Sequence, residues 1–129
     1  MDSATRVLIR AHLEKASGKL AVVRRLHAAG DHDDAVSRAY YSAFHAVRAL
    51  LVSAGQTAST HHGAVTLFNL LFVKTGKLGK EVGRYFANLK DDRESVDYEP
   101  FADADEERSA GAVREAGRLL YLKRELLLD

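Results

Sequence analysis

The chain of 129 residues contains no cysteine, so it can form no disulfide bond, no thiolate metal site and no cysteine nucleophile. Proline occurs once, at Pro100, and a chain so poor in helix breakers can form long helices. The longest apolar runs, such as 49–52 and 68–73, are far too short to cross a bilayer. The N-terminus lacks an apolar stretch after a basic start, so we expect no signal peptide and a cytoplasmic protein.

The composition is that of one folded domain, with 47% hydrophobic and 29% charged residues. We expect a single domain over residues 1–129, because one hydrophobic core suffices at this length. The net charge is only +1, which excludes a chain that binds polyanions through its overall charge. Basic residues are nevertheless concentrated between 6 and 29 and acidic residues between 91 and 107. The basic segment either follows phosphates or is an ordinary solvated helix face.

Apolar residues recur at helical spacing through most of the chain, and no long run alternates as a strand does. The pattern predicts helices over 3–29, 33–54, 60–75 and 77–93, and one from about 104 to the C-terminus. Ser3 is the expected N-cap of the first helix, and Gly30 follows its end. Residues 95–102, which include Pro100, are expected to form a loop. The prediction is an all-α fold, an up-and-down antiparallel bundle of four to five helices.

The second predicted helix is apolar on one face and carries polar and aromatic side chains on the other. Its apolar seam is centred on Val36, Tyr40 and Val47. Arg38, Tyr41 and His45 then share the opposite side. This polar strip faces a second copy of the chain, a nucleotide, or the rest of the bundle, in which case its side chains form a buried hydrogen-bonded layer.

A second polar segment lies just before the only proline. Arg93, Asp97 and Tyr98 are expected at a junction between helix and loop, where the core does not need them. Arginine is suited to bidentate contact with phosphate. The simpler alternative is an Arg93–Asp97 ion pair that anchors the loop.

We expect neither a metal nor a cofactor. His61 and His62 are adjacent, so on a helix their side chains point about 100° apart and cannot bind one ion together. No set of residues has the spacing of a zinc site, and the Gly76–Lys80 segment lacks the pattern of a phosphate-binding loop.

Three strings together resemble the HEPN superfamily, in particular its UPF0332-like branch. They are Arg-Ala-Tyr-Tyr-Ser-Ala-Phe-His at 38–45, His-Gly-Ala-Val at 62–65, and Arg-Glu-Ser-Val-Asp-Tyr at 93–98. The resemblance extends over residues 17–127. It implies a helical bundle that forms a homodimer and pairs with a minimal nucleotidyltransferase antitoxin. Active members of the family are metal-independent endoribonucleases with an Arg-x(4–6)-His motif.

The resemblance implies a toxin that acts on RNA, and the residues suggest how. Cleavage without a metal needs a base for the 2′-hydroxyl and a cation for the phosphate. No histidine follows His62, so the base would be His45 or Asp97. The candidate catalytic residues are Arg38, His45, Arg93 and Asp97. The candidate RNA- or nucleotide-binding residues are Tyr41, Tyr98 and His62. This site requires that the second helix and the segment around Arg93 share one pocket.

Two other functions remain open. In one, the chain is a non-catalytic module that binds a nucleotide or a nucleotidyltransferase, and Tyr98 or Tyr41 accepts a transferred nucleotide. In the other, it is a structural helical adaptor whose polar strip is a dimer interface.

Overall fold

The computed structural model describes residues 2–126 of the chain, with side chains described for residues 2–122. Within this part the chain forms five α-helices and no strand: α1 (Ser3–Ala28), α2 (His32–Ser53), α3 (His61–Phe68), α4 (Lys80–Tyr98) and α5 (Glu106–Leu126). A short π-helical stretch, η1 (Asn69–Val73), extends α3. The expected all-α bundle is therefore confirmed. The expected continuation of the last helix to Asp129 lies outside the described residues.

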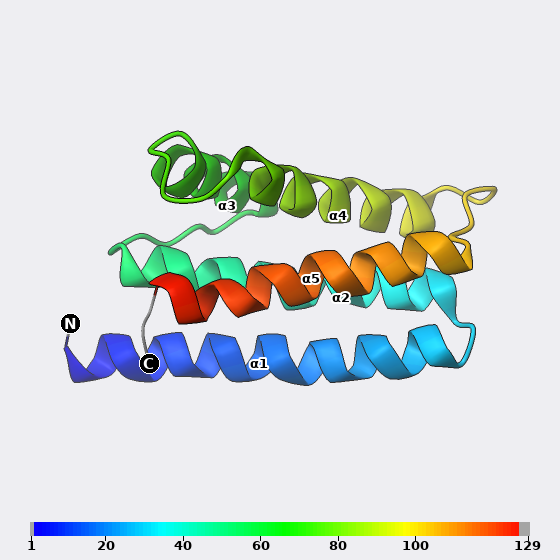
Figure 1. Cartoon of the computed structure of the whole chain (residues 1–129), viewed down its shortest axis with the longest axis horizontal. Coiled ribbons are helices and arrows are strands. Elements are labelled where there is room, and N and C mark those ends of the chain that lie inside the picture. The colour runs from blue at the N-terminus through cyan, green and yellow to red at the C-terminus, as the bar shows by residue number, and fades with distance from the viewer. Residues whose placement is uncertain (1, 127–129) are drawn as a thin grey trace.

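Helix α2 lies at the centre of the bundle and contacts α1, α3, α4 and α5. The long helices run alternately up and down, with α1 and α4 on either side of α2 and α5 packed along it (Figure 1). The apolar seam predicted for α2 is buried throughout. At most 1% of the surface of any of its residues is exposed: Val36, Tyr40, Ala43, Val47 and Leu50. The ring of Tyr40 stacks on Phe86 of α4, with the two ring centres 5.9 Å apart.

Four helix boundaries follow local chemistry that the sequence displays. Gly30 has a φ of 85° and Gly55 a φ of 74°, a conformation that favours glycine and ends α1 and α2. The Thr60 side chain accepts a hydrogen bond from the Gly63 amide at 2.9 Å and so caps α3. The N-cap of α1 is Asp2 rather than Ser3, because its carboxylate accepts a hydrogen bond from the Thr5 amide at 2.7 Å.

Helix α4 differs most from the prediction. It begins at Lys80 rather than Lys77 and continues to Tyr98, so Asp97 and Tyr98 are helical and not part of a loop. Pro100 forces extended backbone only on the residue before it, Glu99, whose φ and ψ are −99° and 120°. The helix can therefore run up to Tyr98, which places Arg93, Asp97 and Tyr98 on one rigid element.

Candidate functional site: an arginine among three tyrosines

Arg93 lies between the central helix and the end of α4. Only 7% of the surface of Arg93 is exposed. Its guanidinium carbon lies 5.1 Å from the ring centre of Tyr40, 5.6 Å from that of Tyr41 and 5.9 Å from that of Tyr98. Each distance is within the range in which a cation is attracted to an aromatic ring. The two segments that the sequence singled out, on α2 and before Pro100, therefore meet at Arg93.

The hydrogen-bonding capacity of Arg93 is not used up by its neighbours. A terminal nitrogen lies 3.8 Å from Glu94 Oε1, a long ion pair, and Glu94 is also bound by Lys90 at 2.7 Å. The Nε of Arg93 is buried and has no hydrogen-bond partner among the described residues. A buried donor without a partner is unfavourable by about 1–3 kcal/mol, so this nitrogen is a candidate donor to a bound ligand.

His61 supplies an imidazole to the same place. Its Nδ1 lies 2.6 Å from the hydroxyl of Tyr40, and its ring centre lies 4.6 Å from that of Phe44. Burial lowers the pKa of His61 below its usual 6.5, and the charges of Arg93 and Lys90 lower it further. The ring is therefore neutral at pH 7. Burial raises the pKa of Tyr40, so its hydroxyl stays protonated.

An open pocket of about 720 Å³ exposes part of this cluster. Its lining consists of Tyr41, His61, Asp91, Arg93, Glu94, Ser95, Tyr98 and Glu99. The volume lies in the range of small-molecule sites. Tyr98 is 73% exposed, so much of its side chain remains accessible beside the cation. The acidic residues all come from α4 and its end, which makes that rim negative.

The other predicted site residues lie elsewhere. Arg38 and His62 are exposed and do not line the pocket. Asp97 is exposed and accepts a hydrogen bond from Ser37 at 3.1 Å, not an ion pair with Arg93. His45 packs on α1, where its Nδ1 lies 3.1 Å from that of His12. No described contact joins His45 to Arg93. His45 shares a face of α2 with Tyr41 but lies one helical turn, about 6 Å, further along the helix, where that face borders α1.

Sequence reasoning assigned Tyr40 only to the core and found no role for His61. A buried tyrosine hydroxyl needs a polar partner, which is a usable signal. The pattern within α2 does not say which distant residue provides that partner. The cap at Thr60 fixes where α3 begins, and only packing against α2 brings His61 to Tyr40.

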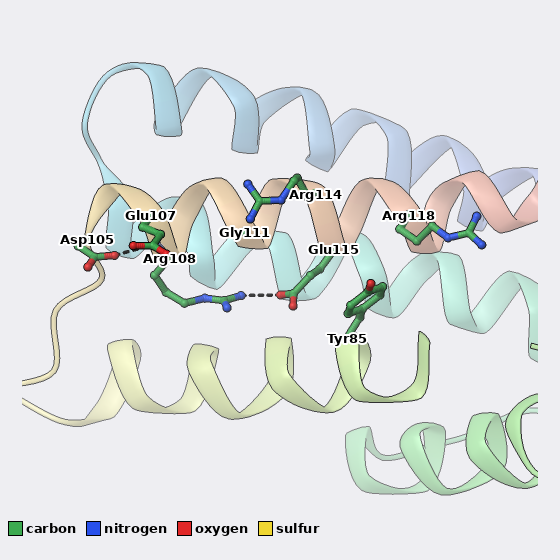
Figure 2. Close-up of a pocket in the computed structure, with 8 residues that line it drawn as sticks. All are labelled: Tyr85, Asp105, Glu107, Arg108, Gly111, Arg114, Glu115 and Arg118. Carbon is green, nitrogen blue, oxygen red and sulfur yellow. Dashed lines mark hydrogen bonds and ion pairs between the residues drawn. The ribbon is translucent and has the colours of Figure 1, made fainter. Parts of the chain in front are cut away.

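Another hollow, between α4 and α5, contains none of the predicted site residues (Figure 2). Arg108 crosses it, with its Nη2 2.5 Å from Glu115 and its Nε 2.9 Å from Asp92. Arginines and carboxylates are mixed along its walls. The ion pair between Arg108 and Asp92 joins α5 to α4 across this groove.

The described residues contain neither a cluster of metal ligands nor a membrane-spanning helix. No group of three histidine, aspartate or glutamate side chains is placed so that it could hold a metal ion. None of the described helices combines the length and the apolar character needed to span a membrane.

The HEPN domain model matches residues 9–126. The chain belongs to the HEPN family. A UPF0332 protein of Thermotoga maritima is 36% identical over 81% of this chain and 75% of its own length, which places the HEPN domain in the UPF0332-like branch. MJ0142 of Methanocaldococcus jannaschii, named a candidate toxin, is 34% identical over 67% of this chain and 59% of its own length. A second protein so named in that organism, MJ0605, is 33% identical over 70% of this chain and 67% of its own length.

Proposed function

We propose that this HEPN chain is a toxin that cleaves RNA without a metal, at the pocket around Arg93. The observation that carries the proposal is the presence of a buried cation, Arg93, and a neutral imidazole, His61, in one open pocket. The candidate-toxin names of two relatives add support. The proposal includes a cytoplasmic location, a homodimer, and a minimal nucleotidyltransferase as antitoxin.

The proposed chemistry assigns one task to each residue. When His61 donates its Nδ1 hydrogen to the Tyr40 oxygen, its Nε2 carries the lone pair of a general base. That nitrogen takes the proton of a ribose 2′-hydroxyl, and the 2′-oxygen bonds to the adjacent phosphorus. The bond from phosphorus to the 5′-oxygen then breaks, and the 5′-oxygen takes a proton from water. The product is a 2′,3′-cyclic phosphate.

Arg93 and the exposed tyrosines hold the substrate in this scheme. Arg93 donates hydrogen bonds to the phosphate oxygens, where negative charge grows in the transition state. Tyr41 and Tyr98 present ring faces on which the neighbouring bases stack. His61 thus takes the place that the sequence gave to His45 or Asp97.

The test is incubation of the purified chain with a fluorescent single-stranded RNA in the presence of EDTA. We expect fragments that end in a 2′,3′-cyclic phosphate, identified by mass spectrometry, and a loss of at least 100-fold in rate for His61→Gln. His62→Gln, at the exposed neighbouring histidine, is the matched control and should cleave normally. RNA that stays intact at high protein concentration would rule out this function.

A second function is favoured by the exposure of Tyr98. Its ring lies beside the Arg93 guanidinium and is 73% exposed. In this alternative a partner nucleotidyltransferase transfers AMP from ATP: the tyrosine oxygen attacks the α-phosphorus, pyrophosphate leaves, and the phenolic proton goes to solvent. Incubation with the partner and ATP should add the mass of one AMP, and Tyr98→Phe should abolish the addition while Tyr85→Phe should not. An unchanged mass of the wild-type chain would exclude it.

A further inference from the structure

The seam between α1 and α2 contains a pair of histidines in direct contact. The Nδ1 atoms of His12 and His45 lie 3.1 Å apart, and their ring centres lie 5.4 Å apart. One of these nitrogens must donate its hydrogen to the other, so the two rings cannot both be protonated in this geometry. Both side chains are half-buried.

This pair is surrounded by positive charge. Burial, as the largest cause, and the charges of His12, Lys19, Lys15 and Arg48 together lower the pKa of His45 to about 4. Burial, Arg48 and Lys15 likewise lower the pKa of His12. Carboxylates do not contribute to either shift, and no ion pair joins Lys15, Lys19 or Arg48 to an acid within the described part of the chain. We call Lys15, Lys19, Arg48 and the two histidines the basic strip.

The basic strip continues into the Arg93 pocket. The Arg48 guanidinium lies 5.4 Å from the ring centre of Phe44, and that ring lies 4.6 Å from His61. The charge of Arg48 also acts on the pKa of His61. On α2, Tyr41, His45 and Arg48 are spaced four and three residues apart, so they share one face and extend over about 10 Å.

We propose that the basic strip binds the phosphate backbone of a single-stranded RNA and leads it into the Arg93 pocket. The proposal rests on the proposed function, because it supplies the path of that substrate. Cations without counter-charges favour phosphate, and the Phe44 and Tyr41 rings beside them offer stacking surfaces. The part of the pocket lining that comes from α4 and its end carries Asp91, Glu94 and Glu99, which repel phosphate. The strand therefore enters from the side of α1 and α2.

The experiment measures binding separately from cleavage. A fluorescent 2′-O-methyl RNA has no free 2′-hydroxyl and cannot be cut by the proposed route, so its anisotropy reports affinity alone. We compare Lys15→Gln/Lys19→Gln with Arg24→Gln/Arg25→Gln, which removes the same charge from an exposed part of the same helix. At low salt the first variant should bind about tenfold more weakly, and its slope of log affinity against log salt should fall by about 1.4, which is about 0.7 for each lysine on a single strand. The control should stay within twofold of wild type.

Two outcomes would overturn the basic strip as an RNA path. One is equal binding by the two double variants. The other is normal RNA binding by Lys15→Gln/Lys19→Gln together with loss of self-association in light scattering, which would make the strip an interface with a second copy. Cleavage of unmodified RNA is assayed in parallel. Strip-dependent binding without cleavage would reject the proposed function alone, and cleavage without strip-dependent binding would reject the path alone.

Discussion

The guanidinium carbon of Arg93 lies 5.1 Å from the ring centre of Tyr40, so α4 sets its buried cation against the ring at the centre of α2. The same ring also stacks on Phe86, and its hydroxyl reaches His61. Tyr40 thus connects the core to both groups proposed to act on RNA. The stability of the bundle and the geometry of the site share this residue.

Replacing Arg93 by lysine should separate charge from shape. Arg93→Lys keeps the positive charge but loses the planar guanidinium that three tyrosine rings surround and that donates to phosphate in two directions. We expect RNA cleavage to fall by about 100-fold or more while the protein still folds. Arg84→Lys, at an exposed position of the same helix, is the control. Normal cleavage by Arg93→Lys would show that only the charge matters.

Removal of the Tyr40 hydroxyl should affect His61 and leave the ring stacking intact. Tyr40→Phe removes the partner of His61 Nδ1 at 2.6 Å. We expect about 1 kcal/mol lower unfolding free energy from urea titration. We also expect at least tenfold slower RNA cleavage, because the imidazole is no longer oriented. Tyr85→Phe, on the α5 side of α4, provides the comparison. A Tyr40→Phe protein that cleaves RNA at the wild-type rate would argue against His61 as an oriented base.

The pH dependence of cleavage should report the lowered pKa of His61. A general base acts in its neutral form, and burial with Arg93 and Lys90 keeps this histidine neutral at lower pH than usual. The rate should therefore rise with pH only below 6.5 and be constant above it. Initial rates in buffers of constant ionic strength provide the measurement. A rate that still rises steeply above pH 7 would point to a different base.

Stability should fall in acid because of His45. Its pKa is lowered to about 4 in the folded chain against 6.5 for a free histidine, so between these values the unfolded chain binds more protons. The contribution of neutral His45 to the free energy of unfolding is complete above pH 6.5 and is lost as the pH falls toward 4. From pH 7 to 4.5, wild type should lose on the order of 1 kcal/mol more than His45→Gln in urea titrations, a figure reduced for partial exposure. An equal loss of unfolding free energy in wild type and His45→Gln would contradict the lowered pKa of His45.

A buried serine joins the ends of three helices and should matter for stability alone. Ser109 of α5 is fully buried, and its hydroxyl lies 2.5 Å from His27 Nδ1 and 2.7 Å from His32 Nδ1. Ser109→Ala leaves both imidazoles without this partner, so we expect a loss of about 1–3 kcal/mol in unfolding free energy. Ser17→Ala, at an exposed position of α1, should change it by less than about 0.5 kcal/mol. RNA binding should be unaffected, since the cluster is not part of the pocket lining.

Much of the fold could be predicted because the information is local. The repeat of apolar residues determined which face of α2 is buried, and Tyr40 and Val47 lie where that repeat placed them. Gly30 ended α1 for the steric reason expected. The end of α4 was predicted wrongly, because Pro100 was expected to end the helix near Arg93, whereas the helix continues to Tyr98. The steric effect of Pro100 reaches only Glu99.

The site could be predicted only in part. Arg93, Tyr41 and Tyr98 were named from the sequence and lie together. His45 was grouped with them because it shares a face of α2 with Tyr41, but one helix face can border two neighbours. Tyr41 faces α4, and His45 faces α1.

The sequence by itself determined the helical class, the buried seam of the central helix and the presence of an arginine with two tyrosines suited to phosphate and bases. Only the tertiary structure decided that His61 joins Arg93 and that His45 joins His12. The reason is physical. Helical periodicity fixes the direction of each side chain about its own axis, whereas the crossing and register of packed helices fix which side chain it meets.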